Sequence, residues 1–496
     1  GDAPLLRSWG VDARASRLIP AAAAQLAPAD IPRLKLKWAL DFHGAIRARS
    51  QPTFGLGMMF VGSQNGTVFA LDPASGCLRW RYRAAAEVRT PVVLGVEEGV
   101  KAPAAPLAFF GDIIGNVYAV DARSGAFRWK RRMDDHPSAT ITGAPVFHAG
   151  RLYVPVSSLE EASVDPTYPC CSFRGSLLAL AADSGAVQWK TYTVSKPAAV
   201  TGKTATGVEL RGPSGAPIWN SPSLDLQRGL LYVGTGNNYS WPATELSDSV
   251  VAFELASGKV RWHWQSVSND AWNVACMLNI GGCPDKPGPD FDIGAGTLLL
   301  KVGGRDVIAV GRKDGTVFAL DAERHDKPLW QVKLGRGSIQ GGVQFAMAAD
   351  AERLYVPISD LSDAHDGRVY SEAARPGLYA LRPADGALQW ASRADDVCQK
   401  RPGCDAGILA AVTAIPGAVF AGHLDGRVRA YDARSGKVLW SYDTTPEVST
   451  LSGAKAHGGS IGGPGPMVYG GMVYVNSGYG LYGHMPGNVL LAFAPQ

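Results

Sequence analysis

The sequence has few charged residues and no long apolar run. Only 19% of its 496 residues are Asp, Glu, Lys or Arg while 46% are hydrophobic, which excludes a disordered chain and indicates a large packed core. The net charge is +4 and Lys and Arg are spread along the chain, so we expect no nucleic-acid partner. No apolar run approaches the roughly 18 residues that cross a bilayer, so we expect no membrane span.

Cysteine is scarce, and no CxxC pair of the kind that usually begins a zinc site is present. Cys276 and Cys283, like Cys398 and Cys404, are separated by short loops with Gly and Pro that local disulfides could close. Such disulfides predict an oxidising compartment, the periplasm or the outside of a cell. Cys77 is then left over, and we expect it to be reduced and buried. The alternative, seven free thiols in a cytoplasmic protein, stays open.

The sequence begins at Gly1 and lacks the basic and apolar segments of a signal peptide at its start. We therefore expect a soluble and already processed protein.

What the sequence does contain is a repeat. One pattern recurs seven times. It consists of a short apolar strand, an Asp or a substitute, a turn that usually contains Gly, and a second strand that ends in Trp. Alternating apolar residues around such a turn predict a β-hairpin in each copy. The seven copies end at Trp80, Trp129, Trp189, Trp262, Trp330, Trp390 and Trp440.

The spacing of the repeat predicts the architecture. Trp80 and Trp440 are six steps apart, a mean period of about 60 residues, which suits one four-stranded propeller blade. An eighth copy is split between the chain ends, with LKLKWAL around Trp38 and GNVLLAF around Phe493. We therefore expect an all-β fold, a single eight-bladed β-propeller over residues 1–496 that the terminal strands close, with 1–32 as a lead-in. The repeat Trp residues would pack between blades.

The repeat, the adjacent Cys170 and Cys171, the segment from Trp219 to Asn237 and the C-terminal GGMVYVNSGYGLYGHMPGNVLLAF resemble the quinoprotein alcohol dehydrogenases that use pyrroloquinoline quinone (PQQ). Within that family the likeness is to the polyvinyl alcohol dehydrogenase group. It covers essentially the whole chain. Noncatalytic propellers of the outer-membrane assembly lipoprotein type share the repeat, so the inserted segments are the more discriminating part.

The resemblance implies a site for a flat ortho-quinone with three carboxylates. Such a site needs an aromatic floor, cationic or hydroxyl partners for the carboxylates and a Lewis acid beside the quinone oxygen. By resemblance, Trp219 stacks on the quinone and Asn237 binds Ca²⁺. Lys313 hydrogen-bonds the quinone oxygens, and Arg89 pairs with a cofactor carboxylate.

Other roles follow from the same resemblance. Glu160 falls on the calcium glutamate, with Glu161 as the alternative, and Thr142 and Ser157 fall on hydroxyls that bind the cofactor carboxylates. Oxygen ligands of this kind suit Ca²⁺.

Two features depart from the family pattern. The vicinal pair Cys170-Cys171, which covers the quinone in the family, follows the glutamate strand here instead of preceding it, so it forms this lid from another loop or is structural. In NDAWNVAC, Asn273 stands where the methanol-oxidising relatives have an Asp as general base, and an amide cannot take a proton. Asp270 is the nearest carboxylate, and we expect it to be the base and a metal ligand, with Asn273 facing the cation or the substrate.

The resemblance implies oxidation of an alcohol to a ketone or aldehyde by hydride transfer to PQQ, with secondary alcohols and polymers such as polyvinyl alcohol as the first candidates. No CxxCH motif is present, so we expect no fused cytochrome domain and a separate cytochrome c or other electron acceptor. Two alternatives need no quinone. One is a noncatalytic scaffold, and the other is a calcium-dependent hydrolase or lyase that uses Asp270, His263 and His457.

Overall fold

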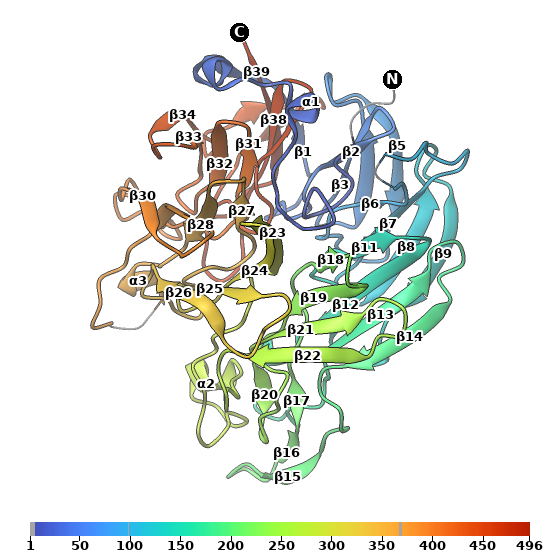
Figure 1. Ribbon diagram of the computed structural model, residues 1–496, viewed down its shortest axis with the longest axis vertical. Helices are drawn as coiled ribbons and strands as arrows, with labels where there is room; N and C mark the ends of the chain where they lie inside the picture. Colours follow the sequence, from blue (N-terminus) through green and yellow to red (C-terminus); the bar gives the residue numbers. More distant parts are fainter. Residues whose placement is uncertain (1–4, 98, 367–369) are drawn as a thin grey trace.

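The computed structural model describes residues 5–97, 99–366 and 370–496, and most of its regular structure is β-strand (Figure 1). Its main sheets are eight antiparallel blades, numbered here in chain order. Blades 1 to 4 consist of β2 (Thr53–Gly55), β3 (Met58–Gly62), β4 (Thr67–Leu71) and β5 (Leu78–Arg83); β6 (Val93–Leu94), β7 (Leu107–Gly111), β8 (Asn116–Asp121) and β9 (Phe127–Arg132); β10 (Ala139–Thr140), β11 (Val146–His148), β12 (Arg151–Ser158), β13 (Ser176–Ala181) and β14 (Val187–Tyr192); and β18 (Ser223–Asp225), β19 (Leu230–Gly234), β21 (Ser249–Glu254) and β22 (Val260–Gln265).

Blades 5 to 8 follow the same pattern. They consist of β23 (Thr297–Val302), β24 (Arg305–Gly311), β25 (Thr316–Asp321) and β26 (Pro328–Lys333); β27 (Ala348–Ala349), β28 (Leu354–Ile358), β29 (Gly377–Leu381) and β30 (Leu388–Arg393); β31 (Thr413–Ile415), β32 (Ala418–Gly422), β33 (Arg427–Asp432) and β34 (Val438–Asp443); and β37 (Met467–Tyr469), β38 (Met472–Ser477), β39 (Val489–Pro495) and β1 (Leu34–Asp41).

Short elements decorate the blades. The hairpin of β15 and β16 projects from the blades at the bottom of Figure 1. None of the helices in the described residues has the length and apolarity needed to cross a membrane. The short elements are α1 (Ala21–Ala24), α2 (Ala275–Leu278), α3 (Asp363–Asp366), the 3₁₀ turns Pro28–Arg33 and Glu160–Ala162, β15 (Ala199–Lys203), β16 (Glu209–Gly212), β17 (Ser214–Gly215), β20 (Asn238–Ser240), β35 (Val448–Ser449) and β36 (Lys455–Ala456).

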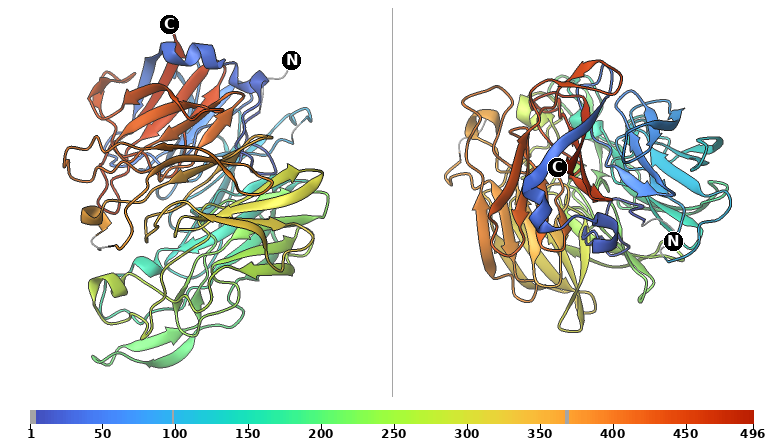
Figure 2. Two further views of the ribbon diagram at one scale, coloured as in Figure 1. Left: turned by 60° about the vertical axis from the view of Figure 1, so that its left-hand side comes forward. Right: turned by 90° about the horizontal axis from the view of Figure 1, so that it is seen from above.

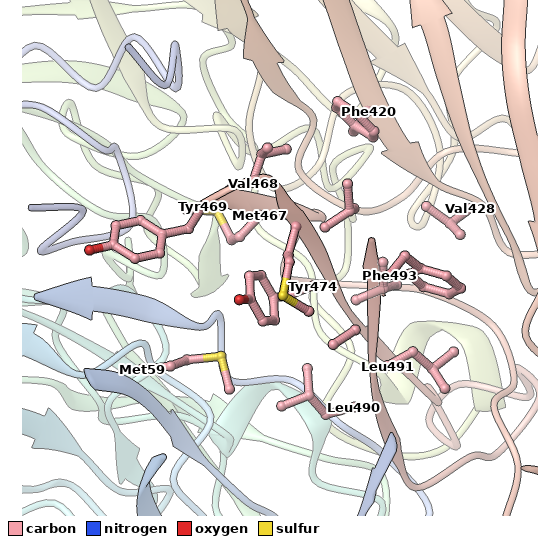
Figure 3. Packing of buried hydrophobic residues seen from close by; sticks show 14 of the residues in the cluster. Met59, Phe420, Val428, Met467, Val468, Tyr469, Tyr474, Leu490, Leu491 and Phe493 are labelled. Atoms are coloured by element: carbon pink, nitrogen blue, oxygen red, sulfur yellow. The ribbon is translucent and has the colours of Figure 1, made fainter. Parts of the chain in front are cut away.

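The ring is closed by the two ends of the chain. β1 pairs with β39 in antiparallel register, with Trp38 opposite Ala492, and the two strands lie side by side in both views of Figure 2. Tyr474 and Phe493 of blade 8 pack with Met59 of blade 1 and Phe420 of blade 7 in one buried cluster (Figure 3). The predicted eight-bladed propeller and its closure are confirmed.

The repeat Trp residues lie on the outermost strand of each blade and face the next blade. The turn Gly of the next hairpin lies against the indole, as at Gly125, where an added Cβ would come within 2.7 Å of the Trp80 ring. Blade 5 has no Gly in its hairpin, and there His325 stacks on Trp262 with ring centroids 4.1 Å apart. Six indoles also donate to a carbonyl of the following blade: Trp80 to Ala122, Trp129 to Ala182, Trp189 to Leu255, Trp330 to Pro383, Trp390 to Ala433 and Trp440 to Leu34.

The N-terminal segment crosses the ring instead of running along its edge. We call residues 5–19 the plug because they contact the innermost strands of six blades. Arg17 lies at its end, fully buried, and donates to Val412 O at 2.7 Å, to Gln51 Oε1 at 2.8 Å and to Thr413 Oγ1 at 2.8 Å. The contacts of the plug to the six inner strands are Leu6 with Phe54, Arg7 with Leu94, Ala13 with Leu224, Arg14 with Leu299, Ser16 with Ala349 and Arg17 with Ala414.

The expected local disulfides, Cys276–Cys283 and Cys398–Cys404, are both formed. The expectation for Cys77 was wrong, because this thiol is exposed. It follows the turn Gly in the hairpin between β4 and β5, and β5 on the outer edge of blade 1 buries only Trp80.

Blade topology decides where a site can form. Each blade is an up-and-down meander, so the connections from its second to its third strand and from its fourth strand to the next blade emerge at one end of the ring. The repeat hairpins occupy the opposite end. The long insertions therefore gather at one end, where connections from different blades can combine into one cavity.

Candidate active site

A cavity of about 390 Å³ lies at the end of the ring that carries the long connections. Five of the residues singled out in the sequence line it together: Arg89, Thr142, Ser157, Trp219 and Lys313. A smaller pocket shares Arg89, Thr142 and Trp219 with it and adds Trp9 from the plug. The plug thus closes the cavity from the centre of the ring.

Trp219 forms an aromatic wall of this cavity. It lies in the connection between β17 and β18, and its indole Nε1 donates to Asp292 Oδ2 at 2.7 Å. Phe345 meets the ring edge to face, with centroids 5.9 Å apart. Gly294 lets the ring come close, since a Cβ at this position would lie 2.2 Å from the indole. The ring is therefore held in a fixed orientation, as a stacking platform requires.

Two buried arginines give the cavity an anion-binding wall. Arg89 donates to Thr140 Oγ1 at 3.1 Å and also to Thr142 Oγ1. Arg49, which the sequence reasoning missed, lies over the Tyr479 ring at 5.2 Å. No acceptor among the described residues serves the Nε of either guanidinium. Burial, with the nearby Arg49 charge, lowers the pKa of Arg89 to about 10, so Arg89 remains charged at neutral pH. Buried guanidinium groups with a donor still free are suited to a carboxylate ligand.

Three buried oxygens without hydrogen-bond donors lie at the wall opposite the two arginines. They are Glu161 Oε1, Asn237 Oδ1 and Asp290 Oδ2, and none has a hydrogen-bond donor among the described residues. The Asn237 amide is fixed because its Nδ2 donates to Asn238 O and Trp272 O, both at 2.8 Å. Buried acceptors of this kind are costly unless a cation or a ligand completes them.

Carboxylates crowd around this group and raise one another's pKa. Burial, reinforced by the charge of Asp292, raises the pKa of Glu161 to about 8. Burial also raises the pKa of Asp290 well above its ordinary value. Hard oxygen donors at this density are the ligand type that Ca²⁺ prefers.

Lys313 supplies the positive charge in this wall. Its Nζ lies 2.9 Å from Asp290 Oδ1 and 3.1 Å from Asp292 Oδ2, and 5.7 Å from the centre of the Trp219 ring. Burial opposes the charge, but Asp290, Asp292 and Glu161 together raise the pKa of Lys313 well above its ordinary value. The ammonium group therefore stays protonated.

Glu160 points away from the cavity. Its carboxylate accepts hydrogen bonds from the Tyr168 hydroxyl at 2.8 Å and from the backbone N–H groups of Ser172 at 2.9 Å and Phe173 at 2.8 Å. Glu161 lines the cavity instead. A 3₁₀ turn over Glu160–Ala162 follows β12 directly, and it turns the second glutamate inward. The geometry favours Glu161, the alternative, over Glu160 as a metal ligand.

Asp270 and Asn273 support the loop behind the cavity and are not among its lining residues. Asp270 accepts from the backbone N–H of Asp290 at 3.2 Å and of Phe291 at 2.9 Å. Asn273 donates to Tyr239 O at 2.9 Å and to Gly282 O at 3.0 Å. Besides Glu161, the cavity is lined by the carboxylates of Asp290 and Asp292, which the sequence reasoning missed. Their signal was the DFD triplet before Gly294 in the inserted segment 264–296.

Cys170 and Cys171 form the vicinal disulfide but are not among the residues lining the cavity. Asn273 Nδ2 lies 3.7 Å from Cys170 Sγ, and the backbone of Arg211 exchanges hydrogen bonds with both cysteines. The pair therefore packs against the back of the Asn273 loop.

The two histidines of the hydrolase alternative do not join this site. Neither His263 nor His457 lines the cavity, and His457 is exposed, with Nδ1 2.8 Å from Gly458 O.

Comparisons with known proteins agree with this geometry. The family model described as glucose/ethanol/alcohol dehydrogenase, β-propeller domain, matches residues 7–336, and that of the outer membrane protein assembly factor BamB matches residues 313–482. A polyvinylalcohol dehydrogenase of Pseudomonas sp. is 41% identical over 98% of this chain and 76% of its own length. One from Sphingopyxis sp. (strain 113P3) is 39% identical over 94% of this chain and 73% of its own.

The fold is also similar to a solved structure. The crystal structure of quinohemoprotein alcohol dehydrogenase from Comamonas testosteroni superposes with a TM-score of 0.70 at 18% identity, covering 99% of this chain and 81% of that one. At this identity the likeness supports the eight-bladed fold alone.

Proposed function

The chain belongs to the PQQ-dependent quinoprotein alcohol dehydrogenases, and from this premise we propose that it binds PQQ with Ca²⁺ in the cavity described above and oxidises a secondary alcohol, including polymers such as polyvinyl alcohol, to a ketone. The observation that carries the proposal is the division of the cavity into two walls. Two guanidinium groups whose Nε atoms have no acceptor among the described residues form one wall, and carboxylate and amide oxygens without donors form the other.

The residues present fit the cofactor. Arg49, Arg89, Thr142 and Ser157 offer cationic and hydroxyl donors for three carboxylates, and Trp219 offers a fixed ring for stacking on a flat tricycle. When bound, PQQ supplies an ortho-quinone that accepts the hydride of the alcohol carbon.

The residues present also fit a hard cation. Glu161 Oε1 and Asn237 Oδ1 would hold Ca²⁺, which would act as a Lewis acid beside the quinone oxygen. Lys313 lies beside them and places a fixed positive charge where negative charge would develop during reduction.

Hydrogen bonding singles out one carboxylate as the base. Both oxygens of Asp292 are occupied, Oδ2 by the Trp219 indole and Oδ1 by the Asn237 backbone N–H at 3.0 Å. Asp290 has Oδ1 on Lys313 and Oδ2 without a donor. We assign the hydroxyl proton of the alcohol to Asp290 Oδ2, with Asp270 holding the backbone of that segment. This replaces Asp270 as the expected base.

Other parts of the proposal concern where the protein works. The two local disulfides and the vicinal one favour the periplasm or the outside of the cell. The reduced cofactor would then pass its electrons to a separate cytochrome c or a comparable acceptor.

The test is calorimetric titration of the metal-stripped protein with PQQ, with and without Ca²⁺, because it needs no knowledge of the alcohol. We expect tight binding that depends on Ca²⁺. Because Glu161, Asp290 and Asp292 carry up to three negative charges, a trivalent lanthanide is a useful second cation in the same titration. Absence of PQQ binding with any cation would reject the proposal.

Turnover then identifies the substrate. The turnover rates of polyvinyl alcohol, a short secondary alcohol and a primary alcohol are measured with the same artificial electron acceptor and compared with one another. A clear preference for primary alcohols would overturn the substrate part of the proposal and leave the cofactor part intact.

A further inference from the structure

Three polar side chains from distant parts of the chain converge at the mouth of the cavity. His365 lies on α3 in the connection between β28 and β29, Asp405 in the connection between β30 and β31, and His484 in the connection between β38 and β39. One ligand atom of each lies within 4.8 Å of the others. His365 also lines the cavity, so the cluster borders it.

The hydrogen bonds of the two imidazoles determine which nitrogens face the cluster. His365 Nε2 lies 3.0 Å from Tyr482 O, and a carbonyl only accepts, so Nε2 carries the proton. His484 Nε2 lies 2.9 Å from Gln340 Oε1, so it also donates. The Nδ1 atom of each ring then faces the cluster, and it would bind a metal ion through its lone pair once any proton on it is released.

The two Nδ1 atoms differ, because His365 Nδ1 is paired with a carboxylate and His484 Nδ1 is not. His365 Nδ1 lies 2.5 Å from Asp405 Oδ2, and the two imidazole rings are stacked obliquely with centroids 4.4 Å apart. His484 is 4% exposed, and its Nδ1 has no hydrogen-bond partner among the described residues. An acceptor buried without a donor is costly unless a cation completes it.

Metal-binding side chains are usually oriented by hydrogen bonds to neighbouring groups, and all three residues of this cluster have such bonds. Tyr482 O and Gln340 Oε1 orient the two rings, and the backbone N–H of Ser362 donates to Asp405 Oδ1 at 2.8 Å, which leaves Oδ2 facing inward.

We propose that His365, Asp405 and His484 form a second metal site, for a divalent transition metal such as Zn²⁺, at the mouth of the cavity. Two imidazole nitrogens and one carboxylate oxygen suit Zn²⁺, whereas the oxygen donors around Glu161 and Asn237 suit Ca²⁺. Three protein ligands leave a fourth position for water or another oxygen ligand. The ion would add a common ligand bond to three connections that hydrogen bonds from His365 and Ser362 already join, and would so stiffen the rim. This inference does not depend on the proposed function.

Co²⁺ and Zn²⁺ are the probes for the test. Metal-stripped wild-type protein is titrated with Co²⁺ in excess Ca²⁺, which keeps the oxygen site occupied, and the visible absorption of nitrogen-coordinated Co²⁺ is recorded. We expect one equivalent of Co²⁺ to give this spectrum and Zn²⁺ to displace it. H365Q and H484Q should each weaken binding by at least about tenfold.

The controls separate this site from others. H457Q removes an exposed histidine outside the cluster and should leave the titration unchanged. H365Q alters a partly exposed residue, so it tests the site even if H484Q destabilises the buried rim. An absent spectrum in the wild type, or equal affinity in wild type, H365Q and H484Q, would overturn the proposal. PQQ binding in the same samples reports separately on the proposed function.

Discussion

Asp290 and Asp292 are only two residues apart, yet their environments differ. Asp292 is fully engaged by the Trp219 indole and the Asn237 backbone, while Asp290 keeps one free oxygen. Asp290 also has a backbone φ of +60°, which is uncommon for a residue with a side chain. The backbone bonds to Asp270 hold it there, so positioning and proton transfer belong to different carboxylates.

This division predicts different effects for two matched substitutions. D290N should lower kcat by about 10²- to 10⁴-fold, the usual contribution of a general base, and leave PQQ bound. D270N keeps an oxygen that can accept from the backbone N–H groups, so we expect a much smaller loss. Steady-state kinetics with a PQQ binding measurement on both variants checks this, and a larger loss in D270N would return the role of base to Asp270.

The two adjacent glutamates predict a second contrast. E161Q removes a charged ligand from the proposed Ca²⁺ site, so the Ca²⁺ concentration for half-maximal PQQ binding should rise by about tenfold or more. E160Q should leave that concentration near the wild-type value, because the partners of the Glu160 carboxylate are Tyr168, Ser172, Phe173 and His136, none of which lines the cavity. The reverse order would make Glu160 the ligand.

At the scale of the element, most blades join the next through a Trp and a Gly. Gly125 has a φ of +72°, and an added Cβ would lie 2.7 Å from the Trp80 ring. Gly150 has the same φ, but nothing lies within 4 Å of its Cβ position. These two glycines therefore separate backbone strain from steric contact.

We predict that G125A lowers the free energy of unfolding by about 2–4 kcal/mol, since overpacking adds to the strain of a positive φ. G150A should cost only about 1 kcal/mol, the strain alone. Denaturant unfolding of both variants measures the difference. Equal losses would show that the contact with Trp80 is relieved by a small shift of the blades.

The elements differ in how far the sequence predicts them. The hairpins and the closure follow from local alternation and from Trp spacing, both of which are visible in the chain. Arg89, Trp219 and Lys313 could be found because the short segments around them resemble the quinoprotein family. Glu161 was ranked second because the 3₁₀ turn after β12 interrupts the strand alternation. Asp290 and Asp292 were missed because their direction depends on the folding of the 264–296 insertion. His365, Asp405 and His484 come together only through the closed ring.

At the scale of the whole molecule, the plug links blades that do not otherwise touch. Arg17 is fully buried, and burial lowers its pKa to about 9, so it is still charged at neutral pH. Its hydrogen bonds to blade 7 and to Gln51 tie the centre of the ring together.

We predict that R17M lowers the free energy of unfolding by about 3–5 kcal/mol, because buried acceptors lose a charged partner. R33M is the control, since Arg33 is 57% exposed and pairs only with Asp30 at the surface, which contributes little. Calorimetric unfolding of both variants checks this. A small effect of R17M would mean that water replaces the guanidinium group.

Ring closure also sets the order of events during synthesis. β1 is among the first strands to be made, and its partner β39 is the last, with more than 440 residues between them. The plug precedes every one of the inner strands that it contacts. Neither can take its final place until β39 has emerged, so blade 8 and the centre of the ring must form after the other seven blades have been made. Until then, the edge of blade 1 and the inner strands stay open to solvent.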